Sequence, residues 1–189
     1  MKLSKIQKLC KETKHIDLYD PGLKLAGITG GQWVGNGKAA YPIDALPKLD
    51  ENSVYLIFGG DPDDKEKYIV KTIDQSPLAR ILEVPLDALE DMSIVQATVN
   101  VGGVELSGLT SADDAVLFDR RLLAPLVGEE YTLHIHRTEN HTYIIAKAGM
   151  FIRAIFAPIV LHRDEDVAAV IRMAGIVTRT CQNGREGVD

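Results

Sequence analysis

Hydrophobic residues recur in the first part of the chain at the spacing of a helix. Leu3, Ile6, Leu9 and Cys10 fall on one stripe, and lysines fan around the rest. Spacings of three and four residues place side chains on one face of a helix. The pattern predicts an amphipathic helix that ends near Lys14. It is followed by residues 15–19, where polar and apolar side chains alternate as they do in a strand.

The rest of the chain alternates between short apolar runs and turn residues. Runs of this length, bounded by Gly, Pro, Asn and Asp, are typical of strands. Asn36-Gly37 lies between two such runs and predicts a hairpin. The predicted strands are residues 54–58, 68–73, 79–84, 95–101, 104–109, 115–118, 130–137, 142–148 and 151–161. Helices or turns are expected at residues 43–49, 85–92 and 119–128, and a last helix from residue 164. These elements predict an α+β fold with antiparallel sheets and short helices on one face.

Four segments share one order of elements, a short apolar helix followed by a strand. The helices begin near residues 3, 43, 85 and 118. Repetition at a period of roughly 35–45 residues indicates an internal repeat. We therefore expect two similar halves, residues 1–76 and 77–163, and a C-terminal helix and tail at residues 164–189. The other interpretation is that helix–strand pairs are common and that no repeat is present.

Length and composition limit the class of protein. The 189 residues are enough for one ordinary domain or two small ones. A content of 46% hydrophobic and 25% charged residues excludes a disordered tail or a collagen-like chain. No apolar run approaches the roughly 20 residues of a membrane helix, and the N-terminal residues lack the apolar core of a signal peptide. We expect a cytoplasmic protein without a membrane partner, with Cys10 and Cys181 reduced and Trp33 in the core.

The charge is negative overall but unevenly distributed. A protein that binds nucleic acid over its whole surface would be basic, whereas this chain carries a net charge of −6. Any such site must therefore be a local patch. The first helix concentrates Lys2, Lys5, Lys8, Lys11 and Lys14 around a single acid, Glu12, and Arg120 and Arg121 open the helix after Asp119. These seven cations are the candidate DNA-contact residues; an ordinary solvated face is the alternative.

Residues 116–135 resemble the closing half of a DNA sliding-clamp domain. In that family a strand feeds a short helix, followed by an acidic turn and three antiparallel strands, and residues 156–160 resemble the apolar-Pro-apolar ending of the last strand. The resemblance extends over residues 79–161 and, more weakly, over 1–75. It implies a non-enzymatic processivity factor without a cofactor. It also implies a homo-oligomeric ring whose helices line a hole for double-stranded DNA and make phosphate contacts. A clamp-fold module that binds other proteins and not DNA is an alternative.

Three of the five histidines cluster near residue 136 and suggest a different class of protein. His134 and His136 lie two residues apart, so a strand would place both on one face, and Glu139 follows. This group resembles part of a cupin motif and would make the protein a metal-dependent enzyme. The other interpretation is the solvated side of an antiparallel strand, with Tyr131, Leu133 and Ile135 facing the core. No Gly-x-Ser-x-Gly or similar nucleophile signature occurs in the sequence.

Overall fold

The computed structural model describes residues 1–20, 31–73, 89–110, 115–138 and 141–159. The chain divides into two compact units. The first is Met1–Asp91 with Arg121–Ala157, and the second is Met92–Arg120 with Pro158–Asp189. Helices and strands are mixed, which confirms the α+β class. The predicted boundaries at residues 76/77 and 163/164, the strand at 79–84 and the helix from 164 lie outside the described residues.

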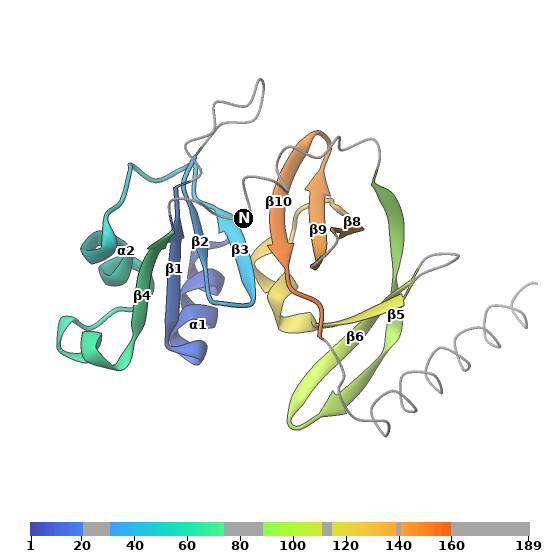
Figure 1. The fold of residues 1–189 in the computed structure, drawn as a ribbon, viewed down its shortest axis with the longest axis horizontal. Helices are drawn as coiled ribbons and strands as arrows, with labels where there is room; N and C mark the ends of the chain where they lie inside the picture. The colour runs from blue at the N-terminus through green and yellow to red at the C-terminus, as the bar shows by residue number, and fades with distance from the viewer. Residues whose placement is uncertain (21–30, 74–88, 111–114, 139–140, 160–189) are drawn as a thin grey trace, which may run out of the picture. The chain divides into compact units, whose positions relative to one another are not determined.

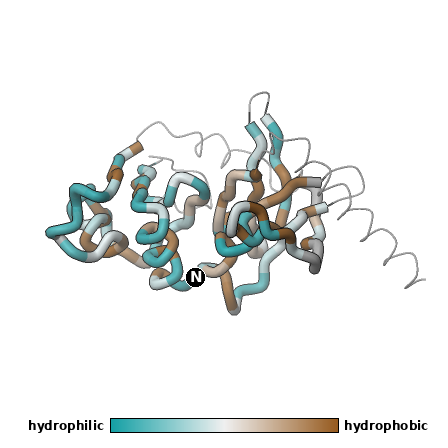
Figure 2. Tube along the Cα trace, turned by 90° about the horizontal axis from the view of Figure 1, so that it is seen from below, coloured by the Kyte–Doolittle hydropathy of each residue, from teal (hydrophilic) through white to brown (hydrophobic). Residues whose placement is uncertain are grey.

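The described elements follow the chain in an order that begins with a helix (Figure 1). The α-helices are α1 (Leu3–Thr13) and α2 (Glu51–Phe58), and the short 3-10 helices are η1 (Pro62–Lys67) and η3 (Arg120–Leu126). The strands of the first unit are β1 (His15–Tyr19), β2 (Trp33–Gly35), β3 (Ala39–Pro42), β4 (Ile69–Ile73), β8 (Thr132–Arg137), β9 (Thr142–Ala148) and β10 (Phe151–Phe156). Those of the second are β5 (Glu90–Val101), β6 (Val104–Thr110) and β7 (Ala115–Asp119). Hydrophobic and hydrophilic positions interleave along this trace (Figure 2).

The strands of the first unit lie in the order β4-β1-β2-β3-β10-β9-β8. Neighbouring strands pair in antiparallel fashion, as expected, except that β4 runs parallel to β1. The expectation of purely antiparallel sheets is therefore wrong at this edge. The reason is the connection through α2, which carries the chain from β3 back to the outer side of β1, as a parallel pair requires.

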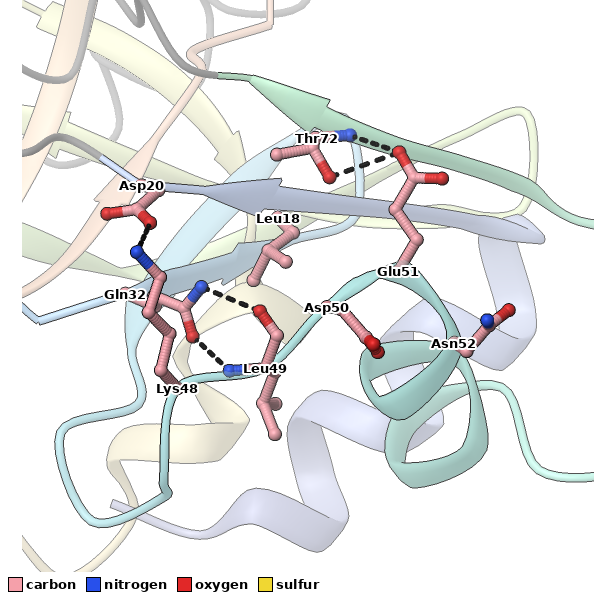
Figure 3. Close-up of a pocket in the computed structure, with 9 residues that line it drawn as sticks. All are labelled: Leu18, Asp20, Gln32, Lys48, Leu49, Asp50, Glu51, Asn52 and Thr72. Atoms are coloured by element: carbon pink, nitrogen blue, oxygen red, sulfur yellow. Dashed lines mark hydrogen bonds and ion pairs between the residues drawn. The ribbon is translucent and has the colours of Figure 1, made fainter.

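Helices α1 and α2 pack against each other and against β1 on the same face of this sheet (Figure 3). The side chains that α1 buries are Ile6, Leu9 and Cys10, and those of α2 are Val54, Tyr55 and Phe58. η3 joins them, because the hydroxyl of Tyr41 on β3 donates to the carbonyl of Leu122 over 2.7 Å. The prediction of helices on one face is confirmed for these elements.

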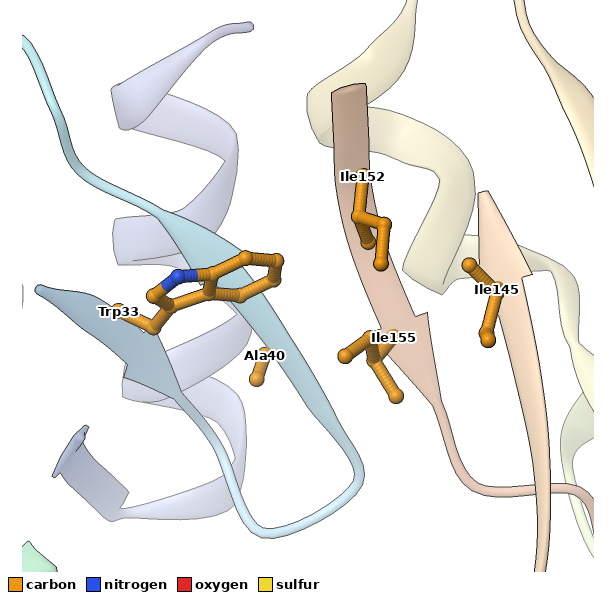
Figure 4. Packing of buried hydrophobic residues seen from close by; sticks show 5 residues of the cluster. All are labelled: Trp33, Ala40, Ile145, Ile152 and Ile155. Atoms are coloured by element: carbon orange, nitrogen blue, oxygen red, sulfur yellow. The ribbon is translucent and has the colours of Figure 1, made fainter. Parts of the chain in front are cut away.

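The other face of the same strands carries a second apolar cluster (Figure 4). It consists of Trp33, Ala40, Ile145, Ile152 and Ile155, all with at most 4% of their surface exposed. Figure 4 places these side chains on the side of the strands turned away from α1 and η3. Trp33 therefore lies in the core, as expected. The sheet is buried on both faces at its centre. The sequences of its central strands are therefore nearly continuous apolar runs in which polar and apolar residues alternate little.

Three predicted elements are wrong. Residues 54–58, predicted as a strand, lie in α2, where the Asp50 carboxylate accepts a hydrogen bond from the Ser53 amide over 2.7 Å and caps the first turn. Residues 62–67 form η1, although no helix is predicted between the strands expected at residues 54–58 and 68–73. Glu90 and Asp91, predicted at the end of a helix, lie in β5. The helix–strand order expected for the second segment of the repeat is therefore absent, and the third segment is not helical at its end.

The second unit is an antiparallel meander of β5, β6 and β7. Its apolar cluster centres on Leu106 and Leu117, against which Val99, Val104 and Ile159 pack. The Ile159 amide donates to the Leu117 carbonyl over 2.8 Å. The chain after β10 therefore returns to β7 and closes this cluster.

Candidate nucleic-acid interface

Helix α1 places its lysines at the surface because its apolar residues face the sheet. Ile6 and Cys10 are fully buried and Leu9 is 6% exposed. Lys5, Lys8 and Lys11 lie on the remaining faces of the helix and are exposed, as are Lys2 before it and Lys14 after it. The helix ends at Thr13, and Lys14, the C-cap residue after it, has the left-handed backbone conformation with φ 54°. All five predicted lysines are therefore accessible.

Helix η3 lies beside α1 although more than a hundred residues separate the two in the chain. The Lys2 amide donates to the Pro125 carbonyl over 2.8 Å. The Arg121 guanidinium lies 3.5 Å from the Glu12 carboxylate of α1. Arg121 and its neighbour Arg120 are exposed. Arg121, which sequence reasoning proposed separately, thus reaches the same surface as the lysines of α1. We call Lys5, Lys8, Lys11 and Arg121 the α1 surface.

Besides Arg121, which contacts Glu12, two more of the seven predicted cations contact other side chains. Lys14 points its ammonium at Tyr68, 3.1 Å from the hydroxyl and 4.5 Å from the ring centroid. Lys8 lies 3.8 Å from Glu12, one helical turn further along α1. Both contacts are exposed, and the exposed ion pair between Lys8 and Glu12 is weak. Glu12 is the one acid within α1, so its contacts with Lys8 and Arg121 leave the α1 surface positive.

The structure describes two of the three residues of the cupin resemblance, His134 and His136. His134 and His136 lie on β8, but His134 is 2% exposed and its Nε2 lies 2.8 Å from the Thr132 hydroxyl. The interpretation of a solvated polar face is wrong for His134, because this residue and its neighbour Leu133, which point to opposite faces of β8, are each only 2% exposed. Glu139 lies outside the described residues. Among the described residues no three His, Cys, Asp or Glu side chains are grouped so as to hold a metal ion.

Sequence reasoning missed a ladder of polar side chains on β1. His15 Nε2 lies 2.8 Å from one Asp17 oxygen, and the Tyr19 hydroxyl donates to the other over 3.3 Å. Asp17 is 4% exposed, so these two partners compensate a buried carboxylate. Burial, together with the negative charge of Asp17, raises the pKa of Tyr19. The strict alternation of polar residues at 15, 17 and 19 was the available signal for this ladder.

An open cleft of about 420 Å³ lies where β1 and β4 end and α2 begins (Figure 3). Its lining combines Leu18, Leu49 and Gln32 with the polar residues Asp20, Lys48, Asp50, Glu51, Asn52 and Thr72. The Lys48 ammonium pairs with Asp20 over 2.6 Å. A crevice at the carboxyl ends of parallel strands is a frequent place for ligands. The sequence pattern does not predict this cleft, because it favours a strand at residues 54–58, which lie in α2.

Comparisons with known proteins do not assign the chain to a family. No protein-family model, no curated protein and no solved structure matches it. Within the described residues no helix is long and apolar enough to cross a lipid bilayer.

Proposed function

We propose that this protein binds double-stranded DNA through the α1 surface, as a clamp-like subunit of a homo-oligomer. The observation that carries the proposal is the meeting of α1 and η3. Their exposed cations come from distant parts of the chain, and the contact between Arg121 and Glu12 brings them to one surface. Regularly spaced cations on a helical face suit contacts with phosphates, which carry no sequence information.

The order of elements in the first unit supports the clamp-like part of the proposal. Helix α1 is followed by the antiparallel strands β1, β2 and β3, and η3 is followed by β8, β9 and β10. The last strands of the two sets pair with each other, Ala40 opposite Ile155 and Ala39 opposite Phe156. Two helix-and-three-strand sets joined in this way place both helices on one face of a continuous sheet. That is the arrangement a protein would use to present helices to DNA.

Salt-dependent binding tests the DNA contact. Binding of a short fluorescent duplex would be followed by anisotropy over a series of salt concentrations for the native chain and for K5E/K8E/K11E. Each phosphate contact contributes about 0.9 to the slope of log K against log salt, so the triple variant should lose a slope of about 2 to 3. The matched control is K65E/K67E/K71E, which changes the net charge equally on exposed lysines of η1 and β4. Equal losses in both variants, or none in the first, would contradict the proposed surface.

A second measurement tests the ring. A closed ring around DNA remains on a circular duplex and slides off once the circle is cut, whereas a groove-binding protein does not distinguish the two. Retention on nicked circular plasmid should therefore fall after linearisation. Sedimentation should give a mass that is a multiple of the 20.7 kDa chain. A monomer retained equally on both forms of DNA would exclude the clamp-like assembly and leave simple DNA binding.

A further inference from the structure

Strand β4 has a partner on one side only among the described strands. It pairs in parallel with β1, from His15 opposite Ile69 to Tyr19 opposite Ile73. The Ile69 amide donates to the Lys14 carbonyl over 2.9 Å, and the Ile73 carbonyl accepts from the Asp20 amide over 3.4 Å. In a parallel pair the amide and carbonyl of one residue point to the same side, and the next residue points to the other. Val70 and Thr72 therefore direct their backbone groups away from β1.

The outward groups of β4 differ in what they contact. The Thr72 amide and hydroxyl both donate to the same Glu51 oxygen, each over 3.1 Å, so this side chain of α2 covers one edge donor (Figure 3). The amide and carbonyl of Val70 lie on the same edge, beside Ile69, which is 51% exposed, and the exposed Lys71. A strand edge with outward amide and carbonyl groups is a template for a further strand.

The cleft described above borders this edge at Thr72 and Glu51. Leu18 and Leu49 supply apolar lining, and three carboxylates, Asp20, Asp50 and Glu51, surround it against the single ammonium of Lys48. The Ser53 amide holds the pKa of Asp50 below its ordinary value, so this group stays ionised. A side chain that enters beside Thr72 therefore meets an excess of negative charge. A guanidinium or ammonium group on an aliphatic stem fits this lining.

We propose that the β4 edge binds an extended segment of a partner protein by strand addition, with an Arg or Lys side chain of that segment in the cleft. Val70 supplies the backbone hydrogen bonds. Glu51 exchanges its bonds to Thr72 for the incoming cation, which frees the Thr72 amide for the added strand. The site uses no residue of the α1 surface, so it is independent of the proposed DNA binding. The charge excess selects a basic segment over an acidic one.

Synthetic peptides test this site directly. The probe is an eight-residue peptide of alternating Thr and Val with one central Arg. Its controls are the same peptide with Glu in place of Arg and one with N-methylated alternate amides. Binding is measured by calorimetry and by amide chemical shifts of the full chain. The Arg peptide should shift the amides of β4 and bind at least about tenfold more tightly than either control, a factor that corresponds to about 1.4 kcal/mol.

Two variants locate the site. V70P removes an edge donor that has no role in the ladder to β1 and should abolish binding of the Arg peptide. E51Q keeps the shape of the side chain but removes its charge, so the preference for Arg over Glu should fall several-fold. The E51Q result stands even where V70P unfolds the chain. Equal binding of the Arg, Glu and N-methylated peptides, or unchanged selectivity in E51Q, would overturn the proposal, as would loss of peptide binding in K5E/K8E/K11E.

Discussion

The side chain of Gln32 pairs with both backbone groups of Leu49, which are buried. Its amide nitrogen donates to the Leu49 carbonyl over 2.9 Å, and its carbonyl accepts from the Leu49 amide over 2.6 Å. Replacement by Ala leaves both groups of Leu49 unpaired in the interior. Each such group costs about 1–3 kcal/mol, so we expect Q32A to lower the free energy of unfolding by about 2–6 kcal/mol in urea titrations. The matched Q7A removes one exposed bond, to the Ile57 carbonyl, and should cost less than about 0.5 kcal/mol. Similar losses in both variants would contradict this account.

Cys10 makes stability depend on pH in the alkaline range. Burial, and secondarily the charge of Asp17, raises the pKa of the thiol from 9.0 to about 12. The native state therefore favours the neutral thiol. Its contribution is complete below the unfolded-state pKa, and it is lost as the pH rises from 9 towards 12. The free energy of unfolding of the native chain should fall more steeply over this range than that of C10A. The difference has an upper limit of about 4 kcal/mol. Parallel curves would show that the thiol ionises normally in the folded protein.

At the scale of elements, hydrophobic periodicity predicts the secondary structure correctly where the local pattern and the tertiary environment favour the same conformation. Helix α1 was predictable because its apolar stripe is regular, and the β2–β3 hairpin because Asn36 accepts hydrogen bonds from both Lys38 and Ala39 amides. Helix α2 was not, because Val54-Tyr-Leu-Ile-Phe is rich in residues that favour strands. There the Asp50 cap and packing against α1 and β1 decide the conformation. Tertiary contacts override weak local preference.

A synthetic peptide tests whether α2 needs tertiary contacts to be helical. Helices shorter than about 12–15 residues are marginal in water even for favourable sequences. A synthetic peptide of residues 47–60 should therefore have a mean helicity below about 20% by circular dichroism, a limit set by the same nucleation cost. The matched peptide of residues 1–14, with its regular stripe and exposed lysines, is the comparison, and it should rise more steeply in trifluoroethanol. A helical α2 peptide in plain buffer would mean that the local sequence is sufficient to form this helix without tertiary contacts.

The candidate sites also differ in whether they can be predicted from residues close together in the sequence. The lysines of α1 follow from spacing alone, since three apolar positions fix which side of the helix is free. That Arg121 would lie 3.5 Å from Glu12 does not follow, because the contact depends on how β3 and β10 pair. The cleft could not be predicted either, because Asp20, Asp50 and Thr72 lie close together only when β4 runs parallel to β1. Groups of side chains within a single helix or strand can therefore be predicted from sequence spacing, whereas groups that the sheet topology brings together cannot.

At the scale of the whole molecule, the first unit is built from two separate stretches of chain. β3 borders β10, and the Tyr41 ring packs edge-on against Phe156 with centroids 6.1 Å apart. A fragment of residues 1–91 keeps α1, α2 and β1–β4 but loses β8–β10 and η3. In this fragment β3 should lack its pairing partner, and Ala40 and Trp33 should lack the isoleucines of β9 and β10 that bury them. We expect no cooperative urea transition, and emission of the single Trp33 at the wavelength of a solvated indole.

The control is a chain of residues 1–159, which retains every described element. It should unfold cooperatively and keep the blue-shifted emission of a buried Trp33, which is 3% exposed. The comparison tests what the part of the first unit beyond residue 91, including the β3–β10 junction, contributes, because both chains contain the same helices α1 and α2 and the same β1–β4 strands. If residues 1–91 unfolded cooperatively with a buried Trp33, the N-terminal half would be a domain by itself. The pairing of β3 with β10 would then join two parts of the chain that fold separately.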